Sequence, residues 1–188
     1  MANVDAPKGF TPVRHLTGGT IRMEEMPIAK ETAAAIFSGD MVEMINTGYI
    51  KVGTATSAEA AVGVFAGCSY TAPDGSKVFS KYWPAGQATL GDADAVAYVY
   101  SDPNIVFAVQ TAGAALFADN GALFDLTATA GSTSTGRSAQ EMNQAASTID
   151  QFRQIGLVKK PDNAWGANAE VEVMFHLHHR LPGAGVET

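Results

Sequence analysis

The fold class of this chain is decided by one stretch, Ala169-Glu170-Val171-Glu172-Val173-Met174-Phe175-His176-Leu177-His178. Apolar and polar residues alternate strictly along it. A β-strand directs successive side chains to opposite faces, so the alternation predicts a half-buried strand. The apolar face of this strand carries Val171, Val173, Phe175 and Leu177, and the polar face carries Glu170, Glu172, His176 and His178.

Similar patterns recur upstream, separated by turn residues. We expect a hairpin at 41–52 around Asn46-Thr47-Gly48, and a second at 61–83 around Ala72-Pro73-Asp74-Gly75-Ser76. Glycines within 61–70 also indicate a β-bulge in that strand. Further strands are expected at 93–100, 105–110 and 149–158. Turn signals spaced about 8 to 12 residues apart favour an all-β fold, mainly an antiparallel sandwich or barrel, with at most one or two short helices.

Four segments lack a clear strand pattern. Residues 1–32 contain several prolines, which fix φ and remove a backbone donor, so we expect an extended N-terminal arm outside the sheets. Residues 33–188 then form a single β-rich domain. Within this domain we expect a long Thr/Ser/Gly surface loop at about 127–140. Residues 138–147 have the best helical propensity for a short helix or turn, and 111–125 suit a short helix or a loop.

Composition and charge exclude several classes of function. The 188 residues carry a formal net charge of −7 without any run of Lys or Arg, which argues against nucleic acid as a partner. No apolar run approaches the roughly 20 residues of a membrane helix, so no membrane partner is expected. The N-terminus lacks signal-peptide features, and a single cysteine, Cys68, suits a buried hydrophobe in a cytosol-like, reducing space.

Charged residues make up only 16% of the chain, below the usual quarter or so of a soluble domain, and small residues are abundant. A surface of this kind suits contact with other proteins.

The most chemical-looking residues are His176 and His178, which share the polar face of the C-terminal strand with Glu170 and Glu172. Two imidazoles on one face are a partial metal site, which needs a third or fourth ligand. The alternative is a polar strand face exposed to solvent or to a partner. Neither a Walker-type phosphate loop nor a Gly-x-Ser-x-Gly motif occurs. We therefore expect no catalytic residues, no metal, no cofactor and no enzymatic activity, with a metal-binding protein or small metalloenzyme using the two histidines as the alternative.

Apolar residues in irregular segments are the candidates for a protein interface. Phe10, Val13 and Leu16 lie on the predicted arm, which packs either on its own domain or on a neighbouring subunit. Trp83 ends a hairpin, and Trp165 lies in a Pro/Asn/Gly-rich loop. Large aromatic residues near turns serve either as core residues or as interface anchors. A carbohydrate-binding module that stacks sugars on Trp83 or Trp165 is a further alternative.

Several segments, taken in order, resemble a group of virion structural proteins of tailed bacteriophages and, more loosely, their small β-rich capsid decoration or cement proteins. The order of the segments, across about residues 35–175, carries this resemblance. They are Gly39-Asp40-Met41-Val42, Gly63-Val64-Phe65-Ala66-Gly67-Cys68-Ser69-Tyr70, Tyr82-Trp83-Pro84-Ala85-Gly86, Asp102-Pro103-Asn104-Ile105-Val106-Phe107, Thr135-Gly136-Arg137-Ser138 and Pro161-Asp162-Asn163-Ala164-Trp165-Gly166.

The resemblance implies a protein that binds the outside of the major capsid shell, often as a homotrimer at a local three-fold axis, and clamps neighbouring capsomers. It also implies assembly in the host cytoplasm and no catalytic residues to transfer. A tail or connector component is the alternative within the same class.

Overall fold

The computed structural model describes residues 3–30, 32–56, 59–91, 95–145 and 147–182 of the chain. Strands dominate these residues, and the only helical element among them is one turn of 3-10 helix, η1 (Phe117–Asp119). The all-β prediction is therefore confirmed. In the same described ranges, no helix is long and apolar enough to cross a membrane.

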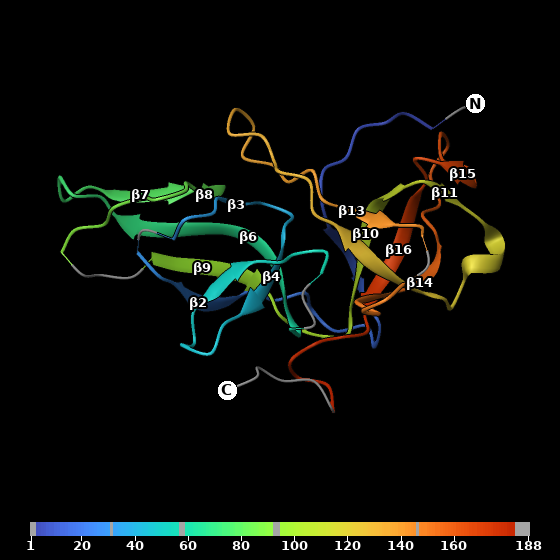
Figure 1. The fold of residues 1–188 in the computed structure, drawn as a ribbon, viewed down its shortest axis with the longest axis horizontal. Coiled ribbons are helices and arrows are strands. Elements are labelled where there is room, and N and C mark those ends of the chain that lie inside the picture. Colours follow the sequence, from blue (N-terminus) through green and yellow to red (C-terminus); the bar gives the residue numbers. More distant parts are fainter. Residues whose placement is uncertain (1–2, 31, 57–58, 92–94, 146, 183–188) are drawn as a thin grey trace.

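Five strands close into a barrel, on the right in Figure 1. The ring runs β10–β13–β12–β14–β16 and returns to β10; only the β10–β13 pairing is parallel. A sixth strand, β1, pairs with the first half of β10 on the outside of the ring. These strands are β1 (Thr11–His15), β10 (Ile105–Ala112), β12 (Leu123–Thr127), β13 (Glu141–Asn143), β14 (Phe152–Leu157) and β16 (Glu170–Phe175).

A second sheet, on the left in Figure 1, has the order β2–β9–β6–β4–β5, with β7 pairing the far end of β6. The sheet curls so that β5 approaches β2. Its strands are β2 (Glu24–Ile28), β4 (Met41–Met44), β5 (Ile50–Val52), β6 (Ala61–Thr71), β7 (Lys77–Ser80) and β9 (Ala95–Tyr100), and two short ladders join β3 (Ile36–Phe37) to β8 (Tyr82–Trp83) and β11 (Ala114–Ala115) to β15 (Gly166–Ala167).

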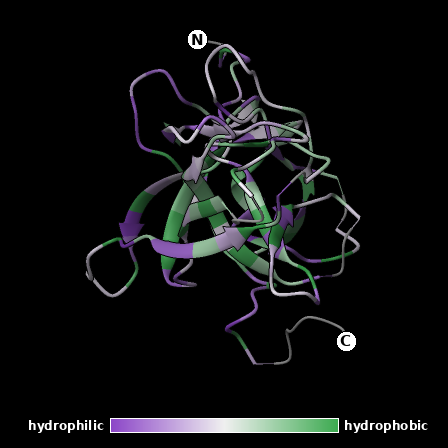
Figure 2. Ribbon diagram, turned by 90° about the vertical axis from the view of Figure 1, so that its left-hand side faces the viewer, coloured by the Kyte–Doolittle hydropathy of each residue, from purple (hydrophilic) through white to green (hydrophobic). Residues whose placement is uncertain are grey.

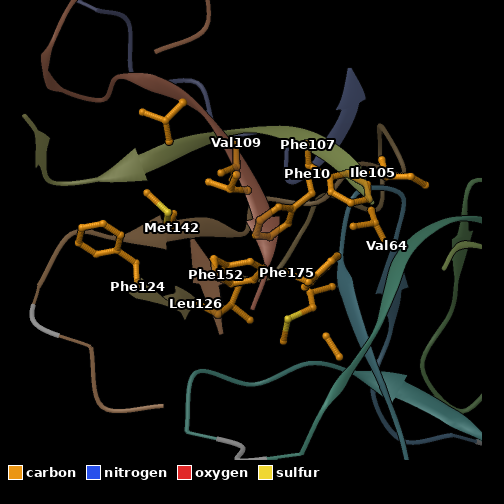
Figure 3. Packing of buried hydrophobic residues seen from close by; sticks show 14 of the residues in the cluster. Phe10, Val64, Ile105, Phe107, Val109, Phe124, Leu126, Met142, Phe152 and Phe175 are labelled. Atoms are coloured by element: carbon orange, nitrogen blue, oxygen red, sulfur yellow. The ribbon is translucent and has the colours of Figure 1, made fainter. Parts of the chain in front are cut away.

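Each sheet encloses its own apolar cluster. In Figure 2 hydrophobic residues lie mainly along the strands and hydrophilic ones mainly in the connections. Aromatic rings fill the barrel: Phe175 packs against Phe107 and Phe152, with ring centroids 5.5 and 5.3 Å away (Figure 3). Three residues of the curled sheet, Met41, Ala61 and Val64, belong to the barrel's cluster, so the two sheets share a core where they meet.

The sequence predictions for individual strands are confirmed at most positions. The hairpins at β4–β5 and β6–β7 are present, and β6 shifts register between Phe65 and Gly67, as expected of a bulge. The predicted strands at 93–100, 105–110 and 149–158 correspond to β9, β10 and β14 in their described parts. The alternation of the deciding stretch continues to Phe175, where β16 ends.

The prediction of an arm outside the sheets is wrong for residues 11–15 and 24–28, which form β1 and β2. Proline is tolerated in both because each strand has a pairing partner on one side only, so a missing donor leaves no ladder bond broken. Phe10 is 2% exposed and stacks on Phe152 with ring centroids 4.8 Å apart. The segment therefore packs on its own domain at this residue.

The sequence predicts a short helix or turn at 138–147. The prediction of a helix is wrong, because residues 141–143 form strand β13. Met142 is fully buried between β10 and β12, and this burial outweighs the local helical propensity. The loop expected at about 127–140 is present between β12 and β13 and extends from the body in Figure 1. Backbone hydrogen bonds Ser38 N–Gly136 O and Ser138 N–Ser38 O fix its end onto the curled sheet.

Asp40 lies buried at this same junction, 2% exposed. Its Oδ2 accepts a hydrogen bond from Phe37 N at 2.7 Å, and its carboxyl also hydrogen-bonds Ser138. Burial raises its pKa to about 6 from an ordinary value of 3.8. Since the folded state holds this proton more tightly than the unfolded state does, the contribution of Asp40 to stability is greatest below pH 4 and falls as the pH rises through about 6.

Replacing Phe10 by alanine should lower the free energy of unfolding by about 3 to 5 kcal/mol, because a cavity opens in the barrel core. Leu16→Ala is the control, since Leu16 is 51% exposed, and it should change the free energy by no more than about 0.5 kcal/mol. Urea denaturation measures both. Equal small effects would mean that the N-terminal segment is not part of the core.

Asp40→Asn should raise the free energy of unfolding at pH 7.5 by about 1 to 3 kcal/mol, because the amide carries no charge to desolvate and still accepts the Phe37 hydrogen bond. The difference from the wild type should disappear near pH 3.5. Urea denaturation across this pH range measures it, with Asp162→Asn in an exposed turn as the control. A variant that is less stable at pH 7.5, or a difference independent of pH, contradicts the assignment.

Candidate functional site

An exposed apolar groove with a cavity volume of about 660 Å³ lies on the outer face of the barrel. We call it the apolar groove. Its large apolar side chains come from β1, η1, β14 with the residue after it, and the loop before β15, and they are Val13, Phe117, Ile155, Leu157, Val158 and Trp165.

Irregularities in two strands place apolar side chains on this outer face. The pairing of β1 with β10 shifts register between Pro12 and Arg14, and that of β14 with β16 shifts between Gln154 and Gly156. A bulge redirects the residues beside it and interrupts the in-and-out alternation of a strand. Val13 lies within the first shift and is 44% exposed.

Phe117 and Trp165 form the aromatic end of the groove. Their rings meet edge to face, with centroids 6.1 Å apart and an interplanar angle of 85°. Phe117 is 73% exposed, whereas Trp165 packs partly against the barrel core. The turn of η1 is fixed by the hydrogen bond from Leu116 N to Asp119 Oδ2 at 2.7 Å. The groove therefore presents an aromatic ring from a fixed position.

Charged side chains border the apolar surface. The Arg14 guanidinium donates to Glu172 Oε2 at 2.8 Å, and Lys159 is exposed at the edge. Behind this edge, Glu170 pairs with Lys8 and Lys160, and these partners lower the pKa of its carboxyl despite partial burial. An apolar centre with a polar rim is the usual anatomy of a protein interface.

The structure separates the predicted interface residues into two groups. Val13 and Trp165, far apart in sequence, both line the apolar groove, and Leu16 is exposed outside it. Phe10 and Trp83 are wrong as surface anchors, because Phe10 is 2% exposed and Trp83 is fully buried. Trp83 instead packs edge-on against Tyr70 in the core of the curled sheet, which also excludes it as a sugar-stacking platform.

Sequence reasoning missed Phe117, the most exposed of the large apolar residues in the groove. The available signal was an apolar pair, Leu116-Phe117, directly before the turn-forming Asp119-Asn120-Gly121. Bulky apolar residues at an exposed turn have no core to fill, so such a pair indicates a binding surface. The bulges in β1 and β14 leave no comparable pattern in the sequence.

The two histidines do not converge as a metal pair. His178 is fully buried: its Nε2 donates to Val62 O at 3.0 Å, and its Nδ1 accepts from Arg180 N at 3.2 Å. Burial lowers its pKa to about 4. His176 is exposed and faces Arg153 instead. The chain leaves strand geometry after Phe175, so the alternation that placed both rings on one face ends before them.

The described residues can also be assessed for a metal-ligand cluster and for a nucleophilic thiol. No group of three or more His, Cys, Asp or Glu residues suited to a metal occurs among the described residues. Cys68 is buried in the curled sheet, and burial raises the pKa of its thiol to about 12. A thiol that stays protonated at neutral pH is a poor nucleophile.

Comparison with protein-family models, with curated proteins and with solved structures finds no match to this chain.

The two tryptophans should differ in their access to a quencher. Trp83 is fully buried and Trp165 lies at the edge of the groove, so acrylamide should quench Trp165 selectively. Trp165→Phe should therefore lower the quenching constant severalfold while leaving the emission of Trp83 in place. Steady-state fluorescence measures this difference. A variant as readily quenched as the wild type would mean that Trp165 is not the exposed indole.

Proposed function

We propose that this chain is a structural protein of a tailed-bacteriophage head, a decoration or cement protein that binds the outside of the major capsid shell. Two lines support the proposal. The order of the sequence segments across residues 35–175 resembles that of virion structural proteins, and the apolar groove offers a surface suited to another protein. The groove, with Phe117 73% exposed beside Val13 and Trp165, is the observation that carries the binding role.

An exposed phenylalanine next to a partly covered tryptophan suits a partner with a matching apolar segment. Aromatic residues contribute most of the energy in many protein interfaces, because each buries a large rigid area. Ring contact between Phe117 and Trp165 restricts both side chains before binding, which reduces the side-chain entropy lost on binding. The occupant that fits is an extended apolar segment of the shell protein.

The clamping role follows from repetition of this contact. A shell strained by packed DNA presents the same binding segment many times, and a homotrimer would occupy three of them together. Linked contacts of modest affinity give high overall affinity without any new interaction. In this role the chain needs shape and area rather than catalysis.

The direct test is to mix the purified protein with expanded empty capsids of the same phage and to image them by cryo-electron microscopy. Density at symmetry-related positions on the outer surface is the expected result, and the site symmetry gives the oligomeric state. A bare shell with all the protein in the supernatant overturns the head assignment and favours the tail or connector.

Phe117→Ser tests the groove itself. Its removal from the surface should lower the occupancy of capsid sites about tenfold or more, as for an interface anchor, while changing the free energy of unfolding by less than about 1 kcal/mol. Leu90→Ser is the matched control, because Leu90 is an exposed apolar residue outside the groove, 49% exposed. Unchanged occupancy for Phe117→Ser contradicts the proposed contact.

A further inference from the structure

A second surface feature lies where the barrel meets the curled sheet. It is a cleft of about 320 Å³ between the segment before β1, the β3–β4 turn, β6 and the end of the 127–140 loop. We call it the junction cleft. Three cationic side chains line it, Lys8, Lys81 and Arg137, and its lining contains no acidic residue.

This concentration of positive charge is unusual for the chain. Acidic residues outnumber basic ones by 19 to 12. Several cations elsewhere pair with a carboxylate, as in Arg14–Glu172, Lys51–Glu59, Lys160–Glu170 and Arg180–Glu24. Lys8 also contacts Glu170, at 3.1 Å. Lys81 and Arg137 have no ion pair within the described part of the chain, a property that they share with other exposed cations such as Arg22 and Lys77. What distinguishes the junction cleft is that its described lining holds three cations and no acid.

The backbone places the segments that carry these two cations side by side. Gly136 lies directly against Lys81, since a Cβ at this glycine would come within 2.9 Å of Lys81 Cβ. The tip of the loop is closed by Ser132 N–Arg137 O at 2.9 Å, and its base is bonded to Ser38. Because Lys81 and Arg137 both line the cleft, an anion held in it is attracted by both charges.

The volume and the lining residues of the cleft indicate which class of anion it can bind. Its volume is at the small end for ligand sites, so it suits one or two side chains rather than a cofactor. Only three cations line the cleft, which does not suit a nucleic-acid backbone that needs an extended cationic path. Pro12 and Ala66 add apolar wall for a side-chain stem, Ser38 and Tyr100 add hydroxyl groups, and an Arg fork matches a carboxylate.

We propose that the junction cleft binds carboxylate side chains of an acidic segment from another protein chain, with Lys81 and Arg137 as the recognising cations. The site is separate from the apolar groove and does not depend on the identity of the groove's partner. In an acidic protein it supplies one local point of attraction for an acidic partner and fixes the register of that partner on the surface.

The test is an NMR titration of the full chain, labelled with nitrogen-15, at low ionic strength of about 20 mM. The probe is an end-capped pentaglutamate peptide, and end-capped pentaglutamine is its uncharged counterpart. Saturable shifts of the Ser38, Gly39, Ala66 and Arg137 amides are expected with pentaglutamate and not with pentaglutamine. Added sodium chloride should weaken the binding.

Lys81→Gln combined with Arg137→Gln should weaken pentaglutamate binding about tenfold or more. Arg22→Gln combined with Lys77→Gln removes the same charge from exposed positions outside the cleft and should leave the affinity nearly unchanged. All four side chains are exposed, and thermal melts confirm that both variants fold.

Three results would overturn the proposal. The first is that pentaglutamate causes no saturable shifts at the cleft. The second is that both double variants lose affinity for pentaglutamate equally. The third is that inorganic phosphate, in a parallel titration, causes saturable shifts at the cleft where pentaglutamate causes no shifts. None of these results bears on capsid binding through Phe117, so the two proposals fail separately.

Discussion

Strand β10 is the element on which the rest of the structure depends. Seven of its eight residues are buried, and it pairs with β16 and β1 along its first part and with β13 at its end. The parallel β10–β13 pairing closes the barrel, so β10 has no free edge within the ring. Because β10 is also buried on both faces, its side chains must be apolar on both, and the run Ile105-Val106-Phe107-Ala108-Val109 meets that requirement. The groove lies on strands that this closure holds in place.

The parts of the fold that followed from sequence are those governed by short-range patterns. Alternation along residues 169–175 and turn chemistry at Asn46-Thr47-Gly48 each act within a few residues, so they are visible without a structure. The errors come from long-range burial. Met142 enters a strand because a place in the barrel core exists for it, and His178 is buried because Val62, 116 residues away, offers a carbonyl acceptor. No local pattern carries either constraint.

In the candidate site too, short-range patterns identified single residues, whereas their spatial arrangement depended on long-range packing. An aromatic residue in an irregular loop was enough to single out Trp165, and an apolar residue in a proline-containing segment was enough for Val13. Their convergence depends on the pairing of β1 with β10 and on two register shifts, which only the folded chain reveals. Trp83 looked equivalent to Trp165 in sequence, yet it pairs through β8 with β3 and turns inward. Burial separates the two, and burial is a property of the whole fold.

The placement of the N-terminal segment has a consequence for the time course of folding. Thr11 pairs with Ala108, and Phe10 stacks on Phe152, so the first strand has no partner until most of the chain has left the ribosome. Such distant pairings slow folding, because a long loop must close before any contact stabilises it. Until then Phe10 and the apolar face of β10 stay open to other chains. The nascent protein is thus most prone to aggregation late in synthesis, and a chaperone acting at that stage would raise its yield more than one acting early.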